Sequence, residues 1–176
     1  MSDKPKILII DDELRMRQSV KELLASQNYE LDTANSAKEA IEFLNNNNVD
    51  LILLDLCLPD KNGYHVMDHI GQPSLGALVI ILTGHGSEES AIEALRRGAY
   101  DYLKKPFEPE KLLITVKNAL NQKKIKMDKE HSNIYSLTAI FVGIPFLLSF
   151  FLLILAAIEM FPFFKHDFLN LLNKFY

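Results

Sequence analysis

Three aspartates in this sequence have the type and placement that suit binding of a divalent cation. Asp11 and Asp12 are adjacent and follow an apolar run, and Asp55 ends a second apolar run. Carboxylates held close together repel one another unless a cation joins them, and Mg²⁺ is a hard ion that prefers oxygen ligands. We therefore expect Asp11, Asp12 and Asp55 to form a Mg²⁺ site.

Two further polar residues stand where they could complete a site for phosphoryl transfer. Thr83 ends a third apolar run, and Lys105 directly precedes Pro106. Transfer of a phosphoryl group onto an aspartate requires cations and donors around a carboxylate nucleophile, because they neutralise the phosphoryl oxygens while the attacking oxygen is held in line. Asp55 is the expected nucleophile, with Thr83 as a hydroxyl donor and Lys105 as a second cation.

Each of these signals also has an ordinary structural interpretation. A pair of aspartates in a loop is often a solvated turn or a helix cap, and a Lys-Lys-Pro sequence is typical of a surface turn. A lone Asp or Thr at a strand end is more often structural than catalytic. The joint occurrence of all these residues, each at the end of its own strand, favours the phosphoryl-transfer site. His85 is not expected to bind a metal, because no second histidine is placed to join it.

The elements that must position these residues alternate between strands and helices. Short apolar runs are typical of strands that are buried on both faces of a parallel sheet. The expected strands are Lys6–Ile10, Glu30–Ala34, Leu51–Asp55, Ala77–Thr83 and Asp101–Lys104. The expected helices are Leu14–Ser26, Ala37–Leu44, Glu88–Arg97 and Glu108–Gln122, with N-caps at Ser36 and Ser87 and a C-cap at Gly98. Five such units predict a doubly wound α/β domain, a five-stranded parallel sheet flanked by helices, whose site lies at the carboxyl ends of the strands.

Charge and composition exclude several classes of protein. Residues 1–122 contain 13 Lys and Arg against 19 Asp and Glu, a net charge of −6, and residues 123–176 contribute +2 to the total of −4. This acidic first part lacks the basic surface of a nucleic-acid-binding protein, and no helix-turn-helix follows it, so direct transcriptional control is disfavoured. The single Cys57 excludes an internal disulfide and a cysteine-based zinc site, and no signal-peptide core follows Met1. We expect a cytosolic domain.

Over Lys4–Gln122 the sequence resembles the receiver domain of bacterial two-component response regulators. The matching segments are ILIIDDE at Ile7–Glu13, LILLDLCLPDKNG at Leu51–Gly63, ILTGHG at Ile81–Gly86 and GAYDYLKKPF at Gly98–Phe107. The resemblance implies the strand order 2-1-3-4-5. It also implies a signalling domain rather than an enzyme: Asp55 would accept a phosphoryl group from a histidine kinase or phosphotransfer protein, and would slowly lose it again.

The resemblance assigns the metal ligands. Asp12 and Asp55 would bind Mg²⁺ through their side chains, Asp11 through a water molecule and Cys57 through its backbone carbonyl. Cys57 and His85, each two residues beyond a key position, would tune how fast the phosphoaspartate hydrolyses.

The resemblance also assigns the residues that respond to the phosphoryl group. Thr83 and Lys105 would contact it, with a cis peptide bond before Pro106. Gly84 would leave room for the phosphoryl group and for Thr83 to move. Tyr102 would be the aromatic switch residue, an assignment compatible with a half-buried tyrosine on an edge strand.

The C-terminal part contains an uncharged run of 25 residues, 134–158, that is rich in Leu, Ile and Phe. Its length exceeds the ~20 residues that cross a bilayer core, and predicts a transmembrane helix. Four lysines precede the run and two follow it: Lys123, Lys124, Lys126 and Lys129, then Lys165 and Lys174. This distribution predicts a single-pass protein of the bacterial inner membrane with the receiver in the cytoplasm. Residues 123–133 would form a basic juxtamembrane linker or a helix extension, and 159–176 a short aromatic, amphipathic tail.

Alternatives remain for both parts. The run 134–158 is also compatible with a buried helix of a small dimerisation domain, with an amphipathic hairpin or with the remnant of a longer membrane protein. The leading functional hypothesis is a membrane-tethered response regulator that switches protein contacts, including contacts with a second receiver. The alternative is a phosphate sink or scaffold without an output of its own. A haloacid-type aspartyl phosphatase is disfavoured, because Cys57 stands where its general acid would be.

Overall fold

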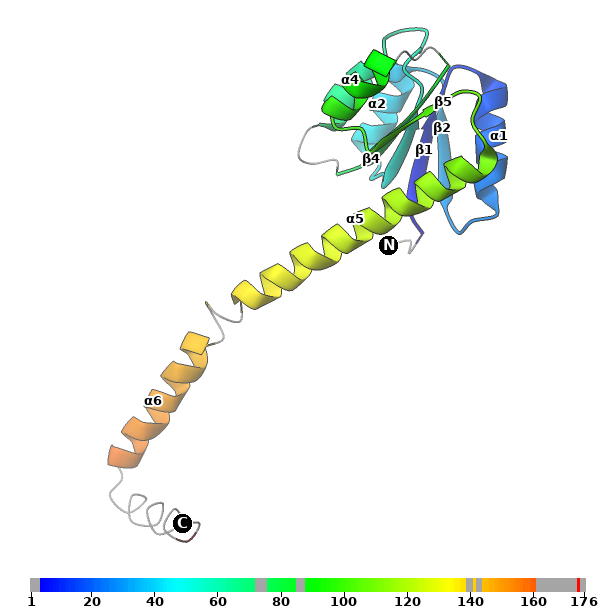
Figure 1. Cartoon of the computed structure of the whole chain (residues 1–176). Coiled ribbons are helices and arrows are strands. Elements are labelled where there is room, and N and C mark those ends of the chain that lie inside the picture. The colour runs from blue at the N-terminus through cyan, green and yellow to red at the C-terminus, as the bar shows by residue number, and fades with distance from the viewer. Residues whose placement is uncertain are drawn as a thin grey trace. The chain divides into compact units, whose positions relative to one another are not determined.

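A sheet of five parallel strands forms the centre of the protein. The computed structural model describes residues 4–71, 76–84, 88–138, 141, 144–160 and 174. The strands are β1 (Lys6–Ile10), β2 (Glu30–Ala34), β3 (Leu51–Leu54), β4 (Leu78–Thr83) and β5 (Asp101–Lys104). Their order is β2-β1-β3-β4-β5 and every pairing is parallel (Figure 1). The predicted fold class and strand order are confirmed.

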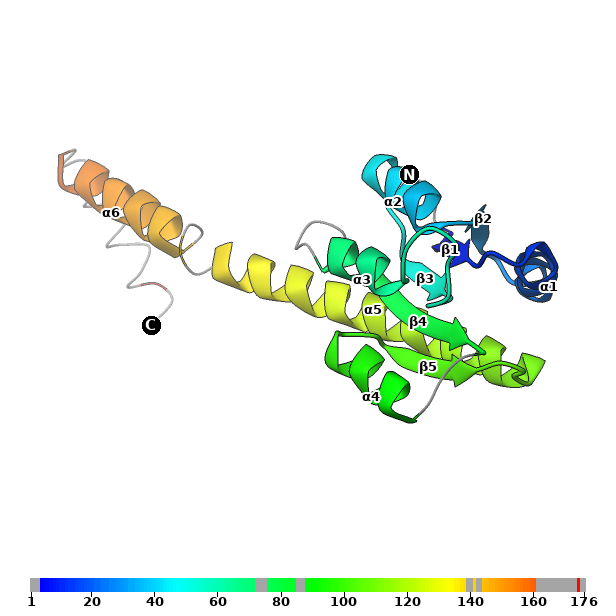
Figure 2. The same cartoon turned by 90° about the horizontal axis from the view of Figure 1, so that it is seen from above.

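Helices cover both faces of the sheet. They are α1 (Leu14–Ala25), α2 (Ala37–Asn46), α3 (Tyr64–Ile70), α4 (Glu88–Arg96), α5 (Pro109–Thr138) and α6 (Ile144–Met160). One buried cluster contains residues of α2, α3 and α4, and a second contains residues of α1 and α5 (Figures 1 and 2). The sheet is therefore the middle of three layers.

The three central strands, β1, β3 and β4, are almost entirely apolar because each contributes to both clusters. In β1, Ile7 and Ile9 belong to the cluster with α1 and α5, while Leu8 and Ile10 belong to the other. None of the four is more than 1% exposed. Successive side chains of a strand point to opposite faces, so burial on both sides requires an uninterrupted apolar run. A polar residue such as Asp11 can follow only where the strand ends.

Two of the three predicted helix-capping residues, Ser36 and Gly98, are found at the start of α2 and after the end of α4. Ser36 is the N-cap of α2, and its Oγ accepts the backbone N–H of Glu39 at 3.3 Å. Gly98 follows α4 with φ of 94° and donates its N–H to the Leu95 carbonyl at 3.0 Å. This left-handed conformation favours glycine. Ser87, the other predicted N-cap, lies outside the described residues.

Asp60 supplies a second cap to α2 from a distant loop, which the sequence analysis did not predict. Its two carboxylate oxygens accept the backbone N–H groups of Ala37 and Lys38, both at 2.9 Å. These hydrogen bonds, led by that from Ala37, hold the pKa of Asp60 below its usual range. Asp60 thereby fastens the loop after β3 to the start of α2.

Helix α5 continues past Gln122 to Thr138, in keeping with the helix extension that was one of the two alternatives for residues 123–133. Between Pro109 and Thr138 the sequence contains no glycine and no further proline, so nothing in the backbone stops the helix. Lys123 anchors this part to the sheet by pairing with Asp50 at 2.8 Å, just before β3. The chain divides into two compact units, Met1–Ile125 and Lys126–Tyr176.

The structure does not support the predicted transmembrane helix over 134–158. Within the described part of the chain, no helix is both long enough and apolar enough to cross a bilayer. Of this run, residues 134–138 belong to α5 and residues 144–158 to α6, while 139–140 and 142–143 lie outside the described residues. Most of the predicted tail, 161–173 and 175–176, lies outside the described residues.

The Asp60 cap predicts a pH-dependent stability difference. Because the pKa of Asp60 is lowered on folding, its contribution is present above its unfolded pKa and is lost as the pH falls through its folded pKa. We expect Asp60→Asn to lower the melting temperature by a few degrees at pH 7, and the difference from wild type to shrink below about pH 4. Thermal unfolding followed by circular dichroism at pH 7, 5 and 3 measures this. Glu42→Gln, an exposed carboxylate on the same helix, is the control, and an equal loss in both variants would contradict the role of the cap.

Candidate functional site

Three aspartates meet at the carboxyl edge of the sheet. Ile10 of β1 pairs with Leu54 of β3, so Asp11 and Asp55, the next residues, emerge side by side. Oxygens of Asp11, Asp12 and Asp55 all lie within 4.8 Å of one another. Asp11 is 2% exposed and Asp55 6% exposed, while Asp12 is exposed. The structure thus brings together the three carboxylates that the sequence singled out.

Lys105, which follows the edge strand β5, extends to these carboxylates at the ends of β1 and β3. Its Nζ lies 2.5 Å from Asp11 Oδ2 and 2.6 Å from Asp55 Oδ2. Lys105 follows β5, and its backbone N–H donates to the Thr83 carbonyl at 3.0 Å. The bond between Lys105 and Pro106 is cis, as the resemblance implied. One side chain therefore connects the ends of β5, β3 and β1.

Backbone hydrogen bonds orient the two buried carboxylates. Asp11 Oδ1 accepts the N–H of Glu13, and Asp55 Oδ1 accepts the N–H of Cys57, both at 2.9 Å. Each carboxylate therefore offers one oxygen to its own loop and the other to Lys105. Gly63 closes the loop after Asp55, and a Cβ there would come within 2.5 Å of the Asp55 carbonyl oxygen.

The charges at this site are not balanced by the protein alone. Burial raises the pKa of Asp11, even though hydrogen bonds from Lys105 and Glu13 favour the carboxylate. Burial alone would lower the pKa of Lys105, but its hydrogen bonds to Asp11 and Asp55 outweigh this and raise it. Three carboxylates face one ammonium, an excess of two negative charges. That excess equals the charge of one divalent cation, and an all-oxygen donor set suits Mg²⁺.

Thr83 and Gly84 lie at the same edge of the sheet. Thr83 is fully buried at the end of β4, opposite Lys104 in the register with β5. A Cβ on Gly84 would meet the Lys105 Cβ at 4.0 Å, an ordinary contact. The space beside Lys105 therefore accepts a small residue without strain. His85 lies outside the described residues.

Tyr102, the predicted switch residue, lies on the edge strand β5. Its hydroxyl is buried and has no hydrogen-bond partner among the described residues. Burial raises the pKa of Tyr102, and Tyr64 adds to this effect. Tyr64 joins α3 to α4, because its hydroxyl donates to the Ser90 carbonyl at 3.3 Å and the Arg97 guanidinium lies 4.7 Å from its ring centroid. The sequence analysis did not identify this contact, which leaves no periodic pattern.

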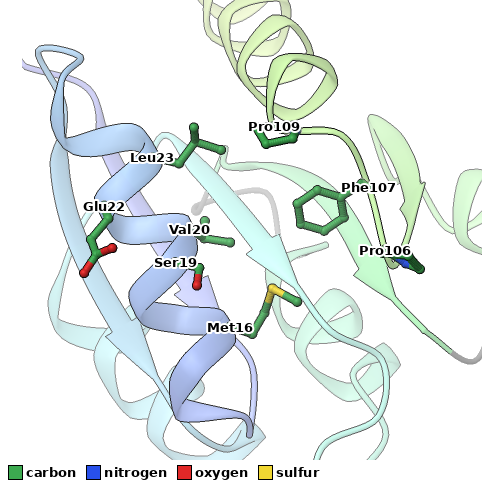
Figure 3. Close-up of a pocket in the computed structure, with 8 residues that line it drawn as sticks. All are labelled: Met16, Ser19, Val20, Glu22, Leu23, Pro106, Phe107 and Pro109. Carbon is green, nitrogen blue, oxygen red and sulfur yellow. The ribbon is translucent and has the colours of Figure 1, made fainter.

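A pocket of about 450 Å³ lies between α1 and the segment after Lys105 (Figure 3). Its lining residues are Met16, Ser19, Val20, Glu22, Leu23, Pro106, Phe107 and Pro109. Figure 3 shows Met16, Val20 and Leu23 extending from α1 toward the side that holds Phe107. Because Pro106 directly follows Lys105, this largely apolar pocket adjoins the acidic site. The sequence analysis did not predict this pocket.

Comparison with known proteins decides the family. The family model for the response regulator receiver domain matches residues 7–117, which is more than half of the chain. The chain belongs to the response regulator receiver family. The receiver is 33% identical over 126 residues to the regulatory protein LuxO of Vibrio cholerae, which amounts to 71% of this chain and only 28% of that protein.

Solved structures agree with this assignment. A CheY-like receiver domain protein of Methanospirillum hungatei JF-1 is 31% identical, with a TM-score of 0.67 that covers 70% of this chain and 99% of that one. The beryllofluoride-activated NtrC4 receiver domain dimer is 36% identical, with a TM-score of 0.64 that covers 67% and 98%. The strand order and the domain size of the receiver are therefore those of the family.

The acidic cluster predicts that Mg²⁺ stabilises the folded receiver. At a concentration 100 times its Kd, an ion that binds only the folded state adds about 2.7 kcal/mol to the free energy of unfolding. We expect the melting temperature to rise with added MgCl₂, and Asp12→Asn to lose most of that rise. Asp12→Asn should also be more stable than wild type in EDTA, because one of three repelling charges is gone. Asp32→Asn, on β2, is the control and should keep the Mg²⁺ response; a wild type indifferent to MgCl₂ would contradict the metal site.

Proposed function

We propose that this receiver accepts a phosphoryl group on Asp55 from a histidine kinase or phosphotransfer protein. The observation that carries the proposal is the double ion pair of Lys105 with Asp11 and Asp55, beside the exposed carboxylate of Asp12. This arrangement holds a carboxylate nucleophile next to one fixed cation and a site for a divalent one. Such a site is what phosphoryl transfer onto an aspartate requires.

The reaction is a displacement at phosphorus. A carboxylate oxygen of Asp55 attacks the phosphorus of a phosphohistidine, the P–N bond breaks, and its electron pair returns to the imidazole nitrogen. The Cys57 N–H orients the Asp55 carboxylate throughout. Lys105 passes from its Asp55 oxygen to an oxygen of the incoming phosphoryl group. Asp12 and Asp55 with their side chains, Asp11 through water and Cys57 with its carbonyl would hold Mg²⁺, which would neutralise further phosphoryl charge.

The same event provides a switch. Thr83 would donate its hydroxyl to the phosphoryl group, and Tyr102 would move toward the space that Thr83 leaves. The Tyr102 hydroxyl has no partner among the described residues, so no hydrogen bond of its own opposes this movement. The Tyr102 hydroxyl, unpartnered within the part of the chain that the structure describes, favours a switching receiver over a phosphate sink, because a phosphate sink needs no side chain that moves on phosphorylation. Contacts with a second receiver are one proposed readout, as in the activated NtrC4 receiver domain dimer.

The pocket beside Pro106 is the proposed contact for the phosphoryl donor. The donor must bring its phosphohistidine to the carboxyl edge of the sheet, and this pocket adjoins that edge through Lys105. Met16, Leu23 and Phe107 give it an apolar lining that suits the apolar side chains of a partner helix (Figure 3).

Substitution of Asp55 tests the phosphoacceptor. We expect Asp55→Asn to abolish phosphorylation by acetyl phosphate in the presence of MgCl₂. The reason is that an acyl phosphate forms on a carboxylate oxygen, and Asn has a non-nucleophilic amide in place of the carboxylate. Phosphate-affinity gel electrophoresis measures the product, which hydroxylamine should remove. Asp32→Asn should be phosphorylated like wild type. Undiminished, hydroxylamine-sensitive phosphorylation of Asp55→Asn would refute the assignment.

Substitution of Leu23 tests the donor contact. We expect Leu23→Ala to slow transfer from a phosphorylated histidine kinase by about tenfold, equivalent to about 1.4 kcal/mol of lost contact. Phosphorylation by acetyl phosphate should not change, because that donor does not use the pocket. The matched control is Leu14→Ala, which removes an exposed leucine from the same helix outside the pocket. The kinase used is one that phosphorylates the wild-type receiver when a set of histidine kinases is screened for phosphotransfer. If Leu23→Ala slowed transfer from the kinase and from acetyl phosphate equally, the proposed contact would be contradicted.

A further inference from the structure

Arg17, on the first turns of α1, contacts the backbone of the acidic pair. Its Nη1 donates to the Asp11 carbonyl at 2.5 Å and to the Asp12 carbonyl at 3.1 Å. Arg17 is half-buried, whereas its neighbour Arg15 is exposed. A single guanidinium nitrogen therefore bridges two consecutive carbonyl groups at the end of β1.

The position of Arg17 in its helix indicates that these contacts are specific. The first turn of a helix carries partial positive charge, so a cation there is unfavourable unless it has a partner of its own. Helix α1 has no acidic residue in its first turn, and its N-cap, Glu13, makes no side-chain capping hydrogen bond. The carbonyl groups of Asp11 and Asp12, which precede the helix, accept hydrogen bonds from Arg17 and so stabilise its positive charge near the helix N-terminus.

Arg17 completes the fixing of the Asp11–Asp12 loop. The Asp11 N–H donates to the Ala34 carbonyl at 3.2 Å, and Asp11 Oδ1 accepts the Glu13 N–H at 2.9 Å. Neither contact reaches the peptide group that joins Asp11 to Asp12, whose carbonyl oxygen accepts from Arg17. Because Arg17 also holds the Asp12 carbonyl, it fixes the backbone on both sides of the Asp12 Cα, from which the exposed Asp12 side chain leaves.

We propose that Arg17 is a positioning residue for the Mg²⁺ site, acting through the backbone of Asp11 and Asp12. The inference rests on the proposed function, because it assumes that this cluster binds Mg²⁺. The sign of the effect separates positioning from charge. If Arg17 acted only as a nearby positive charge, its removal would strengthen Mg²⁺ binding by relieving repulsion. If it positions the loop, its removal weakens Mg²⁺ binding.

Titration of the full chain with MgCl₂ by isothermal calorimetry tests the proposal. We expect Arg17→Gln to raise the Kd for Mg²⁺ by about tenfold, the scale of losses from residues that orient metal ligands. Arg17→Lys should fall in between, because an ammonium can still donate to a carbonyl but lacks the planar fork. Arg15→Gln removes the same charge from an exposed site on the same helix. It should leave the Kd at the wild-type value or slightly below it.

Phosphorylation by acetyl phosphate gives a second readout. For Arg17→Gln, the Mg²⁺ concentration at half-maximal rate should rise with the Kd, while the rate at saturating Mg²⁺ stays within about twofold of wild type. Thermal unfolding in EDTA shows whether each variant folds, and Arg17→Lys carries the test if Arg17→Gln does not. An unchanged or lower Kd in the Arg17 variants, or an equal rise in Arg15→Gln, would overturn the proposal. Failure of the wild type to bind Mg²⁺ would instead refute the proposed function.

Discussion

The ion pairs of Lys105 with Asp11 and Asp55 are the interaction on which the site depends. They require a lysine after β5 to reach aspartates after β1 and β3, which is feasible only when all these strands run parallel and end at one edge. Two buried carboxylates without this ammonium would repel each other at short range in a poorly solvated place. The apolar strands bury the carboxylates, and the lysine makes that burial tolerable. The remaining negative charge is what attracts a divalent cation.

Backbone groups give this charged cluster its geometry. One oxygen of each buried aspartate accepts a hydrogen bond from the backbone N–H two residues further along its own loop. Asp60 in turn binds the loop after Asp55 to the start of α2. Arg17 also holds the loop after β1, by donating hydrogen bonds to two of its backbone carbonyl groups. Such groups are fixed before any ligand arrives, so binding requires little reorganisation. The helices and loops around the site thus serve its geometry as well as the core.

The sequence predicts the sheet and the acidic cluster because both follow from short-range rules. Apolar runs buried on both faces mark the strands, and a polar residue that ends such a run must lie at the strand end, as Asp11 and Thr83 do. Arg17, Asp60 and Tyr64 were missed because a side chain that bonds to a distant backbone group leaves no periodicity behind. For residues 123–133 the sequence left a linker and a helix extension both open, and the extension is the one that agrees with the lack of any helix-breaking residue between Gln122 and Gly143. The transmembrane prediction counted uncharged residues over 134–158, and hydropathy alone does not show that residues up to Thr138 continue α5 while those from Ile144 belong to α6.

The surroundings of Tyr102 suit the proposed switch, in which phosphorylation would change a distant surface. Most buried polar groups are hydrogen-bonded, and leaving one unpaired costs about 1–3 kcal/mol. A hydroxyl buried without a partner among the described residues keeps its present position only through packing, so a small change beside it can shift the balance. Tyr64 lies close enough to influence the pKa of Tyr102 and also holds α4 through Ser90 and Arg97. In the proposed switch, movement of the Tyr102 ring would take place near a residue that holds α4. Tyr102 and Tyr64 would then link the proposed phosphorylation site to the surface of α4.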